Sequence, residues 1–360
     1  MRELYNKIYE IIEKLDYGDI WSGFNRYPFA LYDKENVFFK DKTIPYNTCF
    51  LGNTAIEYDG AFLAIWCVEN PLSENPEALA ANIVHEMFHA YQRANNESRF
   101  PDDLLMLDYP YTQDNITLKY SENLLLSQAA KSQDLLEKKN LLMQFAAARK
   151  YREGLIGDII KQEYLRETVE GMAEYAGNMA LKQISPELYK ERVGGYIEKL
   201  EVLDERLFDI GRLLYYSGFL LCNTLAEAGI DFYHAIGDAE LPLFDIIADN
   251  SLAEKPDIEV DKTRISAELM NYMDSKKSGF NAFLSAHKDE VSGDFYICGY
   301  DPMNMVKFEN MILCSHFIML MGQESSDPVF VEGPVLLKLR KGTTNKVTSY
   351  IRVVLNSSEV

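Results

Sequence analysis

The chain has few of the residues that would build a disulfide framework. It contains only five cysteines in 360 residues, an odd total, and none of them forms a CxxC motif. They lie mostly among apolar residues, where a reduced thiol packs like a small hydrophobic side chain. We therefore expect free thiols in the core and a reducing compartment, the cytoplasm.

Long apolar stretches are also missing. No stretch reaches the roughly 18 uncharged residues of a membrane-spanning helix, and the richest one, residues 311–322, contains a histidine. The first 21 residues interleave charges with apolar residues at helical spacing, unlike the uninterrupted apolar core of a signal peptide. The sequence therefore predicts a soluble protein that is not exported.

Positive charge is scarce relative to negative charge. With 36 lysines and arginines against 56 aspartates and glutamates, the net charge is −20 at pH 7. Such a charge repels phosphate groups at long range, which argues against nucleic acid and anionic membrane surfaces as partners. The hydrophobic content of 47% is ample for a packed core, and the length fits one large domain or two smaller ones.

The order of the periodic segments predicts an α+β fold. Aromatic and β-branched runs separated by turn residues occupy residues 26–70 and predict several short strands. Residues 97–120 carry turn residues and weak periodicity, so we expect a surface excursion there. Long helical patterns fill most of residues 121–229, and the last of them, at residues 196–229, closes at Gly229.

Beyond about residue 290 the pattern changes from helical to alternating. Short apolar runs separated by glycine, proline and asparagine predict a small β unit, with a hairpin near KGTTNK at residues 341–346. We therefore expect a main domain of residues 1–290, in which a small mixed sheet precedes a mainly helical region. Residues 291–360 are expected to form a C-terminal β-rich unit.

Histidine is scarce too, with five in the chain, yet two of them lie four residues apart in VHEMFHAYQ. A helix is expected here, with Asn75 as N-cap and Pro76 at its first position. Residues i and i+4 lie about 40° apart around a helix, so the imidazoles of His85 and His89 can converge on one metal ion. Glu86 can reach a metal-bound water without being a ligand. Apolar neighbours indicate a buried helix, where unpaired imidazoles are costly.

A catalytic zinc site needs a third protein ligand and keeps its fourth position for water. The segment ETVEGMAEYAG resembles the glutamate-glycine-x-alanine-x-tyrosine segment of gluzincin peptidases, the superfamily of thermolysin and aminopeptidase N. That resemblance implies Glu170 as the third ligand, and the small Gly171 after it would let two helices approach closely. Because 80 residues separate His89 from Glu170, the alternative ligands on the same helix stay open. They are Glu163, Glu167 and Glu174, of which we interpret Glu167 and Glu174 as solvated charges.

Two other classes of zinc site fit the sequence less well. A metzincin extension would require glycine at position 92 and histidine at position 95, where this chain has Gln92 and Asn95. A peptide deformylase would supply an upstream cysteine from a glycine-cysteine motif, and the flanks of Cys49 and Cys67 do not match that motif. The glutamate ligand of a gluzincin is therefore the favoured interpretation.

A third segment, YYSGFLLCNTLAEAG, resembles the part of the same superfamily in which a tyrosine three residues before a glycine stabilises the oxyanion. Tyr215 has this spacing to Gly218, Tyr216 is the fallback, and ordinary helix packing is the alternative for both. The strand expected in AFLAIWCVEN fits the edge strand along which such enzymes bind extended substrates. The segment GAFLAIW lacks the glutamate with which aminopeptidases mark a substrate's amino terminus.

The resemblance implies a zincin-like metallopeptidase that uses Zn²⁺ to hydrolyse a peptide or protein substrate. His85, His89 and Glu170 would bind the zinc, Glu86 would act as general base and Tyr215 as oxyanion donor. Carboxylates from the later helices are expected to orient the imidazoles. The alternative is a catalytically inactive protein of the same fold that binds a peptide or a partner protein.

The other three histidines give weaker signals. His234 and His287 follow the motif and fit either surface positions or donors to a transition state. His316 alternates with apolar residues in an expected strand, so we predict a histidine in the core.

Overall fold

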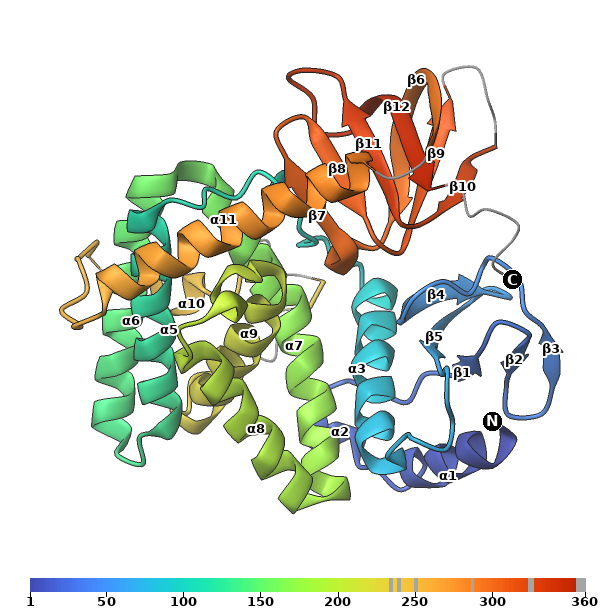
Figure 1. The fold of residues 1–360 in the computed structure, drawn as a ribbon. Helices are drawn as coiled ribbons and strands as arrows, with labels where there is room; N and C mark the ends of the chain where they lie inside the picture. The colour runs from blue at the N-terminus through green and yellow to red at the C-terminus, as the bar shows by residue number, and fades with distance from the viewer. Residues whose placement is uncertain (233–235, 238–240, 249–251, 286–287, 323–326, 354–360) are drawn as a thin grey trace. The chain divides into compact units, whose positions relative to one another are not determined.

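The structure, a computed structural model, describes residues 1–353 except 233–235, 238–240, 249–251, 286–287 and 323–326 (Figure 1). His234 and His287 therefore lie outside the described residues. A mixed five-stranded sheet, a long helical region and an antiparallel seven-stranded sheet follow one another along the chain. The expected α+β class is confirmed.

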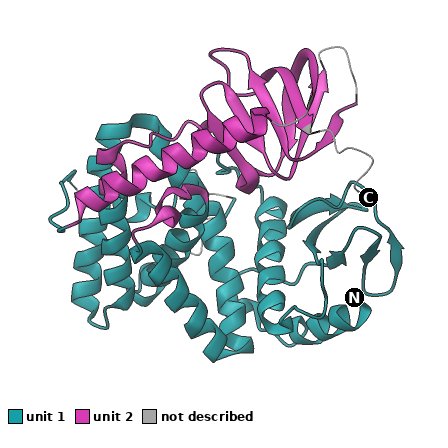
Figure 2. Cartoon of the chain, viewed as in Figure 1, with its two compact units in different colours: residues 1–101, 118–202, 212–259 teal, residues 102–117, 203–211, 260–360 magenta. Residues whose placement is uncertain are grey.

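The residues group into two compact units, neither of which is one continuous segment (Figure 2). Unit 1 consists of residues 1–101, 118–202 and 212–259, and unit 2 consists of residues 102–117, 203–211 and 260–360. The expected division into domains at residue 290 concerns independent folding and stays a prediction.

Unit 1 begins with the strands expected in residues 26–70. Two helices, α1 (Arg2–Ile12) and α2 (Tyr17–Ile20), precede β1 (Phe29–Tyr32), β2 (Asn36–Phe38), β3 (Thr43–Pro45), β4 (Thr54–Tyr58) and β5 (Ala61–Cys67). The strand order is β3-β2-β1-β5-β4, with β1 parallel to β5 and the other pairs antiparallel. The expectation that AFLAIWCVEN forms an edge strand is wrong. A two-residue turn at Asp59 and Gly60, both with positive φ, folds β4 back along β5 and makes β4 the edge.

The helix predicted around the histidine pair is α3 (Pro76–Ala94). The side chain of Asn75 accepts hydrogen bonds from the backbone N–H groups of Glu77 and Ala78, and Pro76 occupies the first helical position, as predicted. The helix ends at Asn95, and Asn96 has a positive φ of 59°. Helix α3 packs against β5 and β4 and against the long helix α7 (Ile160–Ile184).

The helical region is divided into more helices than the periodicity indicated. It contains α4 (Asp103–Met106), α5 (Gln113–Lys131), α6 (Leu135–Ile156), α7, α8 (Pro186–Glu201), α9 (Ile210–Glu227) and α10 (Asp245–Ala248). The surface excursion is shorter than expected because α5 already begins at Gln113. The pattern at residues 196–229 breaks where Val202 turns extended, and it closes at Gly229 with a positive φ, as predicted. None of the helices in the described part of the chain has the length and apolarity needed to cross a membrane.

Unit 2 contains α11 (Lys262–Ser285) and the antiparallel sheet. Its strands are β6 (Lys288–Tyr300), β7 (Met305–Phe308), β8 (Met311–Cys314), β9 (Phe317–Gly322), β10 (Val329–Glu332), β11 (Val335–Leu339) and β12 (Lys346–Val353), in the order β10-β9-β6-β12-β11-β8-β7. The hairpin expected near residues 341–346 joins β11 to β12. The prediction of a core histidine is wrong, because His316 lies in the short turn between β8 and β9 with 49% of its side chain exposed.

All five cysteines are free, as expected. Only Cys222 and Cys314 are buried, however, while Cys49 and Cys298 are exposed and Cys67 is half-buried. The expectation of core thiols therefore holds for two of the five.

Candidate metal centre

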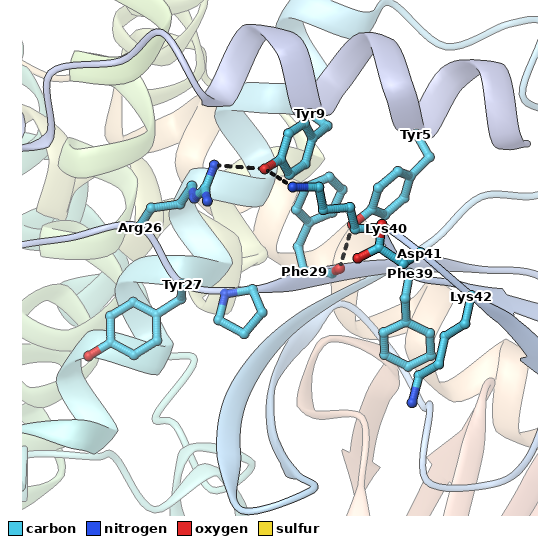
Figure 3. A pocket seen from close by; sticks show the side chains of 10 residues that line it. Tyr5, Tyr9, Arg26, Tyr27, Phe29, Phe39, Lys40, Asp41 and Lys42 are labelled. Carbon is cyan, nitrogen blue, oxygen red and sulfur yellow. Dashed lines mark hydrogen bonds between the residues drawn. The ribbon is translucent and has the colours of Figure 1, made fainter.

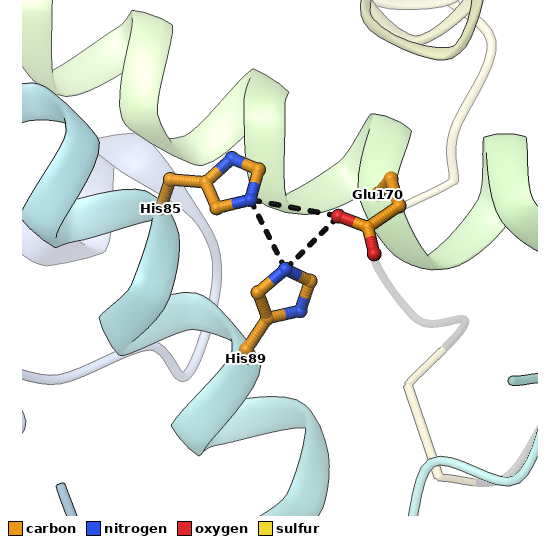
Figure 4. A group of neighbouring side chains, drawn as sticks. All are labelled: His85, His89 and Glu170. Atoms are coloured by element: carbon orange, nitrogen blue, oxygen red, sulfur yellow. Dashed lines mark hydrogen bonds and ion pairs between the residues drawn. The ribbon is translucent and has the colours of Figure 1, made fainter. Parts of the chain in front are cut away.

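Helices α3 and α7 bring two imidazoles and one carboxylate together in unit 1 (Figure 4). The Nε2 atoms of His85 and His89 are 3.0 Å apart. Oε2 of Glu170 lies 3.1 Å from Nε2 of His89 and 3.6 Å from Nε2 of His85. The predicted third residue therefore lies beside the histidine pair, with all three ligand atoms within 4.8 Å of one another.

These separations fit the size of a first-row metal ion. At zinc–ligand distances of about 2.0–2.2 Å and tetrahedral angles, two ligand atoms lie about 3.3–3.6 Å apart. The observed separation of 3.6 Å lies at the upper end of that range, and those of 3.0 and 3.1 Å lie slightly below it. Two imidazole nitrogens and a carboxylate oxygen also form a donor set that zinc commonly takes. The group can hold a metal ion, and its chemistry does not by itself identify the metal.

His89 is oriented by a glutamine of its own helix. Oε1 of Gln92 lies 2.7 Å from Nδ1 of His89, and Nε2 of Gln92 donates to the carbonyl oxygen of Val169 over 2.9 Å. Because that carbonyl requires a donor, the amide oxygen must face the imidazole and accept its proton. The hydrogen bond thus places the proton on Nδ1 and leaves the Nε2 lone pair for a metal. Gln92 also links His89 to the residue before Glu170.

A carboxylate faces Nδ1 of His85, the ring nitrogen that points away from the other two ligand atoms. Nδ1 of His85 is 2.8 Å from Oε2 of Glu174, although the pair lacks hydrogen-bond alignment and Nδ1 has no other partner among the described residues. The hydroxyl of Tyr196 donates to Oε1 of Glu174, and the amide of Asn178 donates to its backbone oxygen over 2.8 Å. The interpretation of Glu174 as a solvated charge is therefore wrong. It is a carboxylate from a later helix at ion-pair distance from an imidazole of the centre.

The buried charges of the centre shift one another's protonation. Burial by itself would raise the pKa of Glu170, but the neighbouring His89 and His85 outweigh burial and hold that pKa well below its usual range. Burial opposes the charged form of His85, yet Glu170 and Glu174 raise its pKa well above the ordinary value. Without a metal the centre therefore favours a protonated imidazole beside an ionised carboxylate. A metal ion would have to displace that proton, which makes metal binding pH-dependent.

Glu86 is buried beside the ligands without being one of them. It is only 6% exposed, and its Oε2 has no hydrogen-bond partner in the described structure. Burial raises its pKa, and the nearby His85 and His89 partly offset that rise. A buried carboxylate oxygen without a partner is uncommon. Such an atom is suited to accept a proton from a bound water or substrate.

Of the two candidate tyrosines, Tyr215 on α9 lies beside the metal ligands. Its ring is parallel to that of His85, with 6.2 Å between the centroids. Burial and the charge of Glu170 raise the pKa of Tyr215 well above its ordinary value, so its hydroxyl keeps its proton. Tyr216 instead accepts a hydrogen bond from Lys199 over 3.4 Å and stacks on Tyr196.

The two remaining alternative ligands, Glu163 and Glu167, belong to a buried charge network. Three cations and three carboxylates, all at most 1% exposed, connect α5, α6 and α7. Its members are Lys119, Glu122, Arg149, Arg152, Glu163 and Glu167. Arg152 contacts Glu163 at 2.7 Å, and Arg149 contacts Glu167 at 3.0 Å. The interpretation of Glu167 as a solvated charge is therefore wrong.

Glycines set the distances between the three helices that carry the site. A Cβ on Gly177 of α7 would lie 2.9 Å from a backbone oxygen of α3 and 3.2 Å from Cβ of His85. A Cβ on Gly171 would lie 2.6 Å from Cα of Gly218 on α9. The expectation that Gly171 brings the glutamate helix close to the histidine helix is thus wrong: Gly171 permits a close approach of α7 and α9, and Gly177 plays the expected part between α7 and α3.

Sequence reasoning missed the roles of Gln92, Glu174 and Gly177. Their spacing gave a usable signal, because Gln92 follows His89 by three residues and Glu174 follows Glu170 by four, which places each pair on one helix face. Gly177 likewise lies seven residues after Glu170, two helical turns along the same face.

Comparison of the chain with protein-family models, curated proteins and solved structures finds no match. The likeness to gluzincins therefore consists of the motifs and of the buried histidine-histidine-glutamate group.

Proposed function

We propose that the chain is a zinc-dependent peptidase that hydrolyses peptide bonds. The observation that carries the proposal is the convergence of Nε2 of His85, Nε2 of His89 and Oε2 of Glu170 from two helices. The free cysteines fit a reducing compartment, and we propose the cytoplasm as its location. The substrate class is a peptide or protein.

Glu86 is the proposed general base. Zinc, when bound, acts as a Lewis acid that lowers the pKa of water and polarises a carbonyl group. Glu86 would then take the proton of the attacking water and pass it to the amine that leaves. Its buried Oε2, which has no hydrogen-bond partner in the described structure, is available for that transfer.

Tyr215 is the proposed donor to the tetrahedral oxyanion. Its raised pKa keeps the phenol protonated, and its ring lies next to that of His85. Removal of one such donor typically costs about 3 kcal/mol of transition-state stabilisation. Tyr216 stacks on Tyr196, whereas Tyr215 stacks on a metal-ligating imidazole, so Tyr216 is less suited to the role.

The edge strand β4 offers a place for an extended substrate. It lies at the end of the sheet order and packs beside α3 in the same unit. A peptide could pair with its outer edge through main-chain hydrogen bonds, as in other cases of strand addition. The sequence had suggested β5 (Ala61–Cys67) as the strand that pairs with substrate, and we now propose β4 (Thr54–Tyr58) for that role.

The test measures metal content and hydrolysis separately. Purified protein should contain or take up about one zinc ion per chain. A peptide-library digest with added zinc should yield fragments, and a chelator should prevent their formation. Glu86→Gln should retain zinc and lose almost all hydrolysis, whereas Glu170→Ala should lose the metal. Full activity of Glu86→Gln would refute the assigned base. A metal-free, inert protein with a bound peptide would instead support the inactive binding protein.

A further inference from the structure

A cavity in unit 1 combines positive charge with aromatic surface and uses none of the metal-centre residues. It has a volume of about 460 Å³ and is lined by residues of α1, the segment before β1, the start of β1 and the turn between β2 and β3 (Figure 3). Of its ten lining residues five are aromatic, three are cationic and one is acidic. The chain as a whole has a net charge of −20, so the composition does not explain this positive lining.

Two of the cations meet at one phenol oxygen. Lys40 donates from Nζ to the hydroxyl of Tyr9 over 2.8 Å, and Arg26 donates from Nη1 to the same oxygen over 3.3 Å. They approach from opposite sides of the hydroxyl in Figure 3. An ammonium group has three donors and a guanidinium group five, and among the described residues each of these side chains makes one hydrogen bond. Most of their donors are therefore available to a ligand.

Among the described residues the carboxylate of Glu13 lies near this pair, and it accepts a hydrogen bond from the Tyr9 hydroxyl over 3.3 Å. The acidic group at ion-pair distance from Arg26 is Glu13, at 3.7 Å, beyond hydrogen-bonding distance. No described carboxylate forms an ion pair with Lys40. Lys40 therefore has no carboxylate partner among the described residues and Arg26 has a distant one, so the cluster keeps positive charge that an anion can neutralise.

The aromatic part of the lining is fixed in position. Tyr5 and Phe29 are buried and stack with 4.5 Å between ring centroids and 14° between ring planes. The hydroxyl of Tyr5 donates to the carbonyl oxygen of Phe29 over 3.2 Å, so its polar end is satisfied. This buried pair forms a rigid base, and the half-buried rings of Tyr9, Tyr27 and Phe39 in the same lining are the aromatic surface that a ligand can contact.

We propose that this cavity binds a small aromatic anion, a planar ring that carries a phosphate or carboxylate group. The anionic group accepts hydrogen bonds from the N–H groups of Lys40 and Arg26 that do not bond to Tyr9. The ring of the ligand lies against the aromatic side chains. The volume lies within the range of about 300–1,000 Å³ that is usual for small-molecule sites. Phosphate and carboxylate groups both accept hydrogen bonds from such cations. The experiment distinguishes a ligand that carries a phosphate from one that carries a carboxylate.

The experiment is calorimetric titration of the full-length chain with phenyl phosphate, inorganic phosphate and benzyl alcohol. We expect saturable binding of phenyl phosphate, weaker binding of the other two, and a decline with added salt. Lys40→Gln and Arg26→Gln should each weaken phenyl phosphate binding about tenfold. Lys7→Gln, at an α1 cation that does not line the cavity and pairs with Glu3 over 2.8 Å, is the matched control and should bind like the wild type. Parallel titrations with adenosine monophosphate and 4-hydroxybenzoate distinguish a nucleotide from a carboxylate ligand.

Three results would overturn the proposal. They are the absence of saturable phenyl phosphate binding up to about 10 mM, equal binding of benzyl alcohol, and undiminished binding in both cation variants. Lys40 and Arg26 are exposed, so both variants should fold, and circular dichroism checks this. A fall in melting temperature without an effect on binding would mean that the cluster only attaches α1 to the β2–β3 turn.

Discussion

Replacement of Gln92 by leucine tests whether the glutamine sets the protonation of His89. The side chain is fully buried and makes two hydrogen bonds, to Nδ1 of His89 at 2.7 Å and to the oxygen of Val169 at 2.9 Å. Leucine has a similar volume but can make neither bond. Without an acceptor at Nδ1, the neutral imidazole is free to carry its proton on Nε2, the atom that faces the metal.

The two hydrogen bonds of Gln92 set the expected losses of stability and of zinc affinity. Each buried polar group that loses its partner costs about 1–3 kcal/mol, partly offset by burial of the apolar leucine, so the unfolding free energy of the metal-free protein should fall by about 2–4 kcal/mol. Loss of a group that orients a metal-ligating histidine typically weakens metal binding about 10–100-fold. We expect a loss of zinc affinity in that range.

Two measurements separate the effects on stability and on metal binding. Urea unfolding of the metal-free protein gives the stability, and competition with a chromophoric chelator at a temperature where the variants are folded gives the zinc affinity. Gln92→Glu keeps the acceptor and should lose less affinity than Gln92→Leu. Gln144→Leu, at an exposed position of α6, is the control. If Gln92→Leu bound zinc as tightly as the wild type, the glutamine would not orient His89.

Three further predictions concern the helices around the site. Gly177→Ala should lower the unfolding free energy by about 1–3 kcal/mol, because the new methyl group would lie 2.9 Å from a backbone oxygen of α3. Gly194→Ala, where nothing lies within 4 Å, should be neutral or slightly stabilising in the same urea titration. Arg152→Met should destabilise by about 3–5 kcal/mol, because it leaves the buried carboxylates of Glu122 and Glu163 without their shared partner; a loss below about 1 kcal/mol would contradict this. Burial would raise the pKa of Glu163, but Arg152 and its other cationic neighbours hold it far below the ordinary 4.5. A carboxylate with a lowered folded-state pKa stabilises the fold above pH 4.5, so this contribution should be lost progressively as the pH falls below 4.5 in wild-type protein and be smaller in Arg152→Met, where Lys119 still contacts Glu163.

Features that depend on neighbouring residues in the chain were predictable from the sequence. The N-cap at Asn75 is such a feature, since a short polar side chain before a proline satisfies the first helical N–H groups without help from elsewhere. The same holds for His85 and His89, because helical geometry alone places them on one face. The assignment of Glu170 required a likeness to known peptidases, since 80 residues intervene and spacing gives no information over that distance.

Features that depend on tertiary contacts were not predictable. The spacing of Glu174 from Glu170 places both on one helix face, but the contact of Glu174 with His85 depends on the packing of α7 against α3. The edge position of β4 follows from pairing across the sheet, which the strand pattern does not contain. His316 was placed in a strand because its turn has no glycine or proline to break the apolar alternation.

The contact between Gly171 and Gly218 limits how this molecule can change shape. Where two helices touch through their main chains, no side chain can change rotamer to let one slide or tilt past the other. We therefore expect the backbone positions that carry Glu170 and Tyr215 to stay close together when a ligand binds. A movement that encloses a ligand is then expected elsewhere in the chain, and the spacing of these two backbones limits the width of a ligand that fits between them.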